Sequence, residues 1–185
     1  MSLDTTKTDK EFKEAMAECR DMFAKKLKDY SASWRIMRPS TLTDQLFIKA
    51  KNIRSFELSG ESRVGDSVKS DFMALINYGI IGLIQLEKGF SDRVDIDSDE
   101  ALALYDKFAK ESYELMLKKN HDYGEAWRDM RVSSYTDFIL TKIERIKEIE
   151  DHNGKTLVSE GIASNYMDII NYAVFGVIRE TEEGK

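Results

Sequence analysis

Apolar residues recur along the chain at spacings of three and four positions, which is the period of an α-helix that buries one face. The only proline, Pro39, and short clusters of turn-forming residues separate these periodic segments. The pattern predicts an all-α fold. The expected helices cover residues 10–28, 42–57, 65–87, 98–119, 135–151 and 160–180, and the expected loops cover residues 31–40, 59–63, 89–97 and 152–155.

One pattern of polar and aromatic positions occurs twice. At a constant offset of 93 residues, the first half is repeated in the second: Lys26, Asp29, Tyr30 and Trp34 recur as Lys119, Asp122, Tyr123 and Trp127. After one inserted residue the offset is 94, and Asn77 and Tyr78 recur as Asn171 and Tyr172. The chain is therefore a duplicated three-helix unit, with repeats at residues 1–89 and 98–185. The segment between them, residues 90–97, is too short for a free linker, so we expect one helical bundle with a pseudo-twofold axis.

Composition narrows the class of protein. Of the 185 residues, 42% are apolar and 34% are charged, which is typical of a globular protein. The net charge of −6 and the lack of a dense basic run give no reason to expect a nucleic-acid polymer as partner. A single cysteine, Cys19, and a polar stretch at residues 1–10 favour the cytoplasm. The apolar third helices are interrupted by polar residues and fall short of a membrane span, so no membrane association is expected.

A polar stripe runs along the last expected helix. It consists of Glu160, Ser164, Asp168 and Asn171. Asp168 and Asn171 lie where this helix becomes apolar on every side, and a buried carboxylate needs a cation or several hydrogen-bond donors. Magnesium and Lys142 are both candidates for that partner. The first repeat has Ala74 in place of Asp168, so we expect the two repeats to differ in chemistry.

Lys142 lies at the edge of the apolar face of its helix, and Lys49 has the same place in the first repeat. A lysine there can contact a phosphate as a compact charge, or it can simply extend along the bundle surface. Both interpretations remain open. Glu144 and Glu148 fall on the opposite face, which favours solvent-exposed charge over a metal site.

The repeated sequence segment that contains Lys119 also has two interpretations. Tyr123 and Trp127 offer flat surfaces for stacking on a base, and Asp122 can accept a hydrogen bond from an amine or a ribose hydroxyl. Alternatively, the aspartate caps the loop and the aromatic residues close the end of the bundle. Neither histidine, His121 or His152, has the spacing of a zinc site or a catalytic dyad.

These residues together carry a resemblance to a known family. They are Lys119, Asp122, Tyr123, Trp127, Lys142, Arg145, Glu160, Asp168, Asn171, Tyr172 and Ala173. The chain resembles the nucleotide modification associated domain family, once per repeat, and is more distantly similar to MazG-like and dUTPase-like all-α nucleoside triphosphate pyrophosphohydrolases.

The resemblance implies a site in the second repeat. Glu160 and Asp168 would hold Mg²⁺ as the catalytic pair, and the metal would bridge the phosphates and activate water. The other implied nucleotide-binding residues are Lys119, Asp122, Tyr123, Trp127, Lys142, Arg145 and Asn171.

Three hypotheses follow. The first is a Mg²⁺-dependent nucleoside triphosphate pyrophosphohydrolase. The second is a non-catalytic nucleotide-binding or assembly protein with a degenerate metal site, which the replacement of an aspartate by Ala74 favours. The third is a helical bundle that binds a protein partner. A homo-oligomer is compatible with each.

Overall fold

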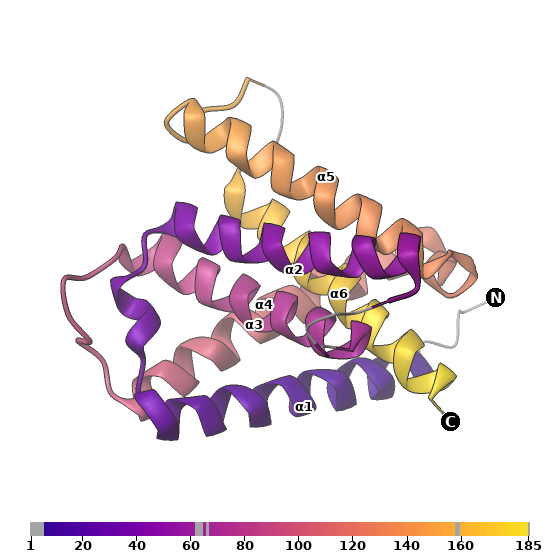
Figure 1. The fold of residues 1–185 in the computed structure, drawn as a ribbon, viewed down its shortest axis with the longest axis horizontal. Coiled ribbons are helices and arrows are strands. Elements are labelled where there is room, and N and C mark those ends of the chain that lie inside the picture. Colours follow the sequence, from indigo (N-terminus) through magenta and orange to yellow (C-terminus); the bar gives the residue numbers. More distant parts are fainter. Residues whose placement is uncertain (1–5, 62–64, 66, 158–159, 185) are drawn as a thin grey trace.

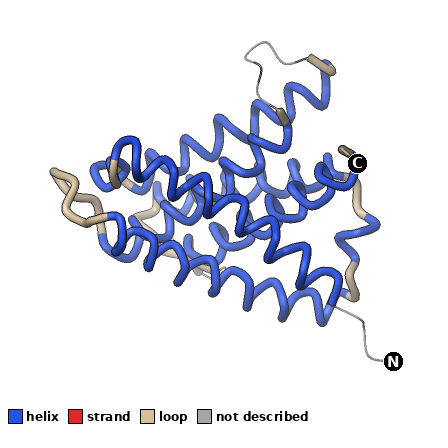
Figure 2. Tube along the Cα trace, turned by 90° about the horizontal axis from the view of Figure 1, so that it is seen from below, coloured by secondary structure: helices blue, strands red, loops and turns tan. Residues whose placement is uncertain are grey.

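The computed structural model describes residues 6–61, 65, 67–157 and 160–184. These residues form helices and connecting loops, which confirms the all-α prediction (Figure 2). The elements are α1 (Thr6–Tyr30), the 3-10 turn η1 (Ser33–Ile36), α2 (Pro39–Ser59), α3 (Val68–Lys88), α4 (Ser98–Tyr123), the 3-10 turn η2 (Ala126–Asp129), α5 (Val132–Asp151) and α6 (Ile162–Glu183).

Both repeats follow the same order of helix, 3-10 turn, helix and helix (Figure 1). The first helix of each continues to its tyrosine, Tyr30 or Tyr123, and so extends past the expected ends at residues 28 and 119. The next residue in each repeat, Ser31 or Gly124, has a positive φ of 56° or 62°, which ends an α-helix. Local backbone geometry, and not hydrophobic periodicity, therefore sets these helix ends.

The expected loop at residues 31–40 is also shorter than predicted. It contains η1, and α2 already begins at Pro39. Proline is well suited to the first turn of a helix, because the amide hydrogen it lacks has no partner there in any case. The other helix boundaries differ from the expected ones by a few residues, as hydrophobic periodicity alone does not define caps.

Reciprocal hydrogen bonds reveal the pseudo-twofold relationship. Thr43 of α2 donates to Glu150 of α5 at 2.9 Å, and Thr136 of α5 donates to Glu57 of α2 at 3.1 Å. Thr43 and Thr136 are repeat equivalents, and so are Glu57 and Glu150, both at the offset of 93 residues. The two halves are thus joined by the same contact made twice.

Helices α3 and α6 cross at the centre of the bundle (Figure 1). A Cβ atom on Gly82 of α3 would collide with the ring of Tyr166, and one on Gly176 of α6 would lie 2.8 Å from the ring of Phe72. These glycines are repeat equivalents, and so are the two rings. Close approach of the helices requires glycine at both positions.

Helices α1 and α4 cover the crossing of α3 and α6 from one side, and α2 and α5 pack side by side on another. Bulky apolar side chains from all six helices fill the space between these elements, among them Phe12, Phe72 and Ile170. In the part of the chain that the structure describes, none of the helices combines the length and apolar character that crossing a bilayer requires.

Candidate functional site

Each repeat contains a cavity between its first helix, its 3-10 turn and its third helix. The first cavity measures about 300 Å³ and the second about 360 Å³. Every residue that lines the second cavity, except Phe138, has its repeat equivalent in the lining of the first. The second is lined by Met116, Lys119, Asn120, Tyr123, Ala126, Trp127, Met130, Phe138, Asp168, Asn171, Tyr172 and Phe175. The cavities are therefore a duplicated feature of the fold.

A side chain from the third helix holds each 3-10 turn in place. Gln85 of α3 donates through its amide nitrogen to three carbonyl oxygens of the first repeat, those of Trp34, Arg35 and Met37. Its equivalent in α6, Arg179, directs Nη1 at the corresponding carbonyls in the second repeat, with the shortest distance, 2.7 Å, to Met130. One wall of each cavity is fixed by this arrangement.

Trp127 forms part of that wall. Its ring stacks on Phe175 with centroids 4.4 Å apart and planes 5° apart, and the Arg128 guanidinium lies 4.4 Å from the ring. The side chain is buried, so stacking of Trp127 on a base would require these neighbours to move. By contrast, Tyr123 is 67% exposed at the rim of the cavity.

Asp168 lies at the junction of two lysines. Its Oδ1 is 2.6 Å from Nζ of Lys119, its Oδ2 is 3.0 Å from Nζ of Lys142, and only 4% of its side chain is exposed. Burial lowers the pKa of Lys119, but the hydrogen bond and charge of Asp168 outweigh it, so the net pKa is raised. One buried carboxylate thus lies between the side-chain nitrogens of two lysines.

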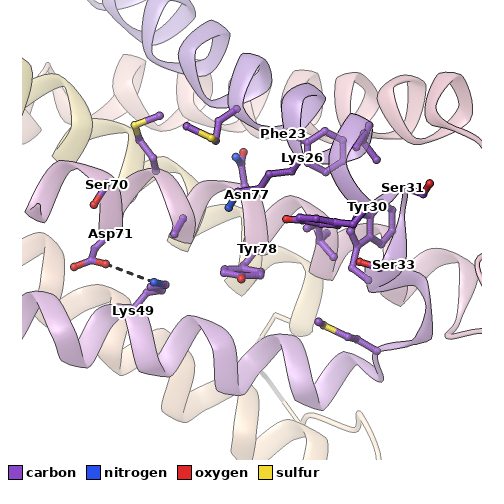
Figure 3. Close-up of a pocket in the computed structure, with 17 residues that line it drawn as sticks. Phe23, Lys26, Tyr30, Ser31, Ser33, Lys49, Ser70, Asp71, Asn77 and Tyr78 are labelled. Carbon is purple, nitrogen blue, oxygen red and sulfur yellow. Dashed lines mark ion pairs between the residues drawn. The ribbon is translucent and has the colours of Figure 1, made fainter. Parts of the chain in front are cut away.

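The first repeat achieves a similar pairing with a different residue. Asp71 lies one helical turn before Ala74, and it accepts from Asn52 at 2.7 Å and lies 3.8 Å from Lys49 (Figure 3). The side chain is as buried as that of Asp168. Alignment of the repeats did not indicate Asp71, because the position equivalent to Asp168 is Ala74. The presence of an aspartate among the apolar residues of α3 was the sequence feature that could have indicated a buried carboxylate.

Asn171 occupies a pseudo-symmetric position. Its Nδ2 donates to the backbone oxygen of Ser112, as Nδ2 of Asn77 donates to that of Cys19. Both distances are 3.0 Å, and the pairs are repeat equivalents. Asn171 Oδ1 is buried and makes no hydrogen bond within the described structure.

The remaining predicted residues lie outside the second cavity. Glu160 is exposed and precedes α6, and it lines an open groove together with Lys142 and Arg145. Asp122 is exposed beside His121, with 3.1 Å between Oδ1 and Nδ1. The structure therefore places Glu160 and Asp168 at different hollows, with Lys142 between them.

Magnesium is a poor match for this donor set. Both carboxylate oxygens of Asp168 are engaged by ammonium groups. Within the described ranges, no group of three or more acidic, histidine or cysteine side chains is arranged to hold a metal ion. Mg²⁺ prefers several oxygen ligands.

A family profile described as Nucleotide modification associated domain 1 matches residues 26–86 and 119–179. The chain belongs to this family. The two matches have the same length and start at equivalent lysines, Lys26 and Lys119, so the same family unit occurs twice in the chain. No curated protein and no solved structure matches the chain, and similarity to MazG-like proteins is not shown.

The cavities fall inside the Nucleotide modification associated domain 1 units. Of their lining residues, only Met22, Phe23 and Met116 lie outside the matched ranges. The lysine, the two tyrosines and the asparagine shared by both cavities are all within them. The shared pocket is thus a property of the family unit as it occurs twice in this chain.

Proposed function

We propose that the protein binds a nucleotide in the second cavity and does not hydrolyse it. The observation that carries this proposal is the position of the Lys119–Asp168–Lys142 cluster, at the edge of a largely apolar cavity that is flanked by Tyr123 and Tyr172. A cationic end and an aromatic end match the two chemical parts of a nucleotide.

The lysines supply the phosphate end of the proposed site. An ammonium group has three N–H donors, and each lysine directs its ammonium at a single oxygen of Asp168. Two positive charges against one negative charge leave a net positive site. The Lys119 side chain is 41% exposed, so its remaining donors can reach a phosphate. The adjoining groove contains Lys142 and Arg145 together with three glutamates, so it adds no net positive charge for further phosphates.

The tyrosines supply the base end. Tyr172 is half-buried and its ring lies 5.2 Å from that of Phe138, which fixes its orientation. Tyr123 lies at the rim and is free to close over a flat ligand. Stacking on an aromatic side chain contributes roughly 1–3 kcal/mol per base. The volume of about 360 Å³ falls within the usual range of small-molecule pockets, about 300–1,000 Å³.

The pairing of Asp168 favours binding over hydrolysis. A metal on this carboxylate would have to displace two ammonium groups at 2.6 and 3.0 Å. Glu160, the other implied metal ligand, is exposed and lines a different hollow. For these reasons the non-catalytic hypothesis suits the geometry better than the pyrophosphohydrolase hypothesis.

Isothermal titration with a panel of nucleoside mono- and triphosphates, in Mg²⁺ and in EDTA, tests the proposal. We expect binding in both buffers and a loss of affinity in Lys119→Met. The control is Lys118→Met, because Lys118 is exposed and does not line the cavity. Pyrophosphate release that requires Mg²⁺ and Asp168 would instead support the hydrolase, and absence of binding would refute both.

A further inference from the structure

We propose that the first cavity is a second ligand site in the same chain, one that takes a nucleoside monophosphate. It is a separate pocket on the other repeat, lined by α1, η1 and α3 with Lys49 from α2. The inference goes beyond the function proposed above and does not depend on it, because its evidence comes from residues of the first repeat.

The chief difference between the cavities is the state of one lysine. Lys26 is the equivalent of Lys119, and it extends into the first cavity (Figure 3). Ala74 stands where Asp168 pairs with Lys119, and among the residues that the structure describes Lys26 has no ion-pair partner. Lys26 is exposed, so its ammonium is a solvated cation beside the cavity, and an anionic ligand in the cavity can pair with it.

A second difference adds a hydrogen-bond donor. Ser33 lines the first cavity at the position that Ala126 holds in the second. Asp71 does not cancel the charge of Lys26, since it lies toward the other end of the cavity beside Lys49 and Asn52 (Figure 3). The first cavity thus offers a phosphate the ammonium of Lys26 and the hydroxyl of Ser33.

Two tyrosines favour a flat ring on the same ligand. Tyr30 from the end of α1 and Tyr78 from α3 both line the cavity, and Figure 3 shows both rings edge-on. A volume of about 300 Å³ lies at the small end of ligand pockets, about 300–1,000 Å³, which suits a small ligand. A nucleoside monophosphate combines the ring with the charge.

Methionine methyl groups report on the two cavities separately. Met22, Met37 and Met73 line the first cavity, and Met116 and Met130 line the second. NMR titration of protein labelled with ¹³C in its methionine methyls, using nucleoside 5′-monophosphates and their parent nucleosides as probes, measures each site in the full chain.

We expect a monophosphate to shift the methyl signals of the first cavity, and the parent nucleoside to bind at least about tenfold more weakly there. Lys26→Gln and Ala74→Asp should each lower the affinity of this site by about tenfold or more, the second by giving Lys26 the partner that Lys119 has. Lys28→Gln is the matched control, since Lys28 is exposed and lies outside the cavity. Unchanged Met116 and Met130 signals in the free variants show that they are folded.

The inference is overturned if monophosphates shift only the second-cavity signals, if the nucleoside binds the first cavity as tightly as its phosphate, or if Lys26→Gln and Ala74→Asp retain full affinity. The first of these results would leave the proposal for the second cavity intact. Shifts confined to the first cavity would support this inference, and binding of a triphosphate that is lost in Lys119→Met would still separately support the proposal for the second cavity.

Discussion

Tyr105 of α4 donates a hydrogen bond to Oδ1 of Asn77 in α3 at 2.8 Å, and so ties the first helix of one repeat to the third helix of the other. The reciprocal bond is missing. The equivalent of Tyr105 is Phe12, which has no hydroxyl, and the equivalent of Asn77 is Asn171, whose Oδ1 is buried without a partner in the described structure. Loss of one hydroxyl in the duplicated sequence accounts for this unsatisfied acceptor.

Phe12→Tyr should therefore stabilise the protein. By pseudo-symmetry the new hydroxyl reaches Asn171 Oδ1, and one net hydrogen bond contributes about 1 kcal/mol to the free energy of unfolding. Urea denaturation measures this change. Tyr105→Phe is the matched control and should destabilise by about 1–2 kcal/mol, because it leaves Asn77 Oδ1 without its donor. Destabilisation by both substitutions would show that the hydroxyl does not reach Asn171.

Gly176→Ala tests the close crossing of α3 and α6. The added methyl group would lie 2.8 Å from the ring of Phe72, in a core with no room for it. We expect the free energy of unfolding to fall by about 1–3 kcal/mol, although alanine by itself favours a helix by about 0.5–1 kcal/mol over glycine. Thermal unfolding provides the measurement. Gly184→Ala should change stability by less than about 0.5 kcal/mol, since its neighbours are at ordinary contact distance. Equal effects at the two sites would contradict the packing argument.

Gln85→Leu tests the residue that holds η1. The Gln85 amide is fully buried, donates to three carbonyl oxygens and accepts from Arg35. Removing it leaves several buried polar groups unsatisfied, with an expected cost of about 2–4 kcal/mol in urea denaturation. Arg179→Leu should cost less, because Arg179 is only half-buried and water can replace part of its hydrogen bonds. A smaller effect for Gln85 than for Arg179 would refute this explanation.

Stability should fall at alkaline pH. Burial raises the pKa of the Cys19 thiol to about 12 from an ordinary value of 9.0, and burial also raises the pKa of Tyr105 and Tyr166 above 10.0. Above about pH 9 the folded state therefore keeps protons that the unfolded state loses. The contribution of these groups to the free energy of unfolding is fully present below about pH 9 and falls as the pH rises further. Melting temperatures measured between pH 7 and pH 11 should show this decline, and Cys19→Ala should remove its first part. A melting temperature that is constant to pH 11 would show that these groups ionise in the folded protein.

The duplication and the helices could both be predicted from the amino-acid sequence. Period and offset are properties of one dimension, and within a helix the spacing of residues fixes which of them share a face. This is why the all-α fold and the two family units were both predicted, and why Asp168 was recognised as a carboxylate in need of a partner. The sequence did not distinguish magnesium from Lys142 as the partner of Asp168. It also did not indicate that Lys119 contacts this carboxylate.

Which side chains contact one another depends on the packing of the helices. Lys119, Lys142 and Asp168 come from α4, α5 and α6, and the distances between side chains on different helices depend on how those helices cross. The same reason explains Asp71, which reaches Lys49 from one helical turn away from the position that alignment of the repeats indicates. A carboxylate on the adjacent turn of a helix can take the place of a missing one, because one turn advances only about 5.4 Å along the helix axis. Sequence correspondence therefore identified the repeated residues, and helix packing determined which of them line the two cavities and how those cavities are charged.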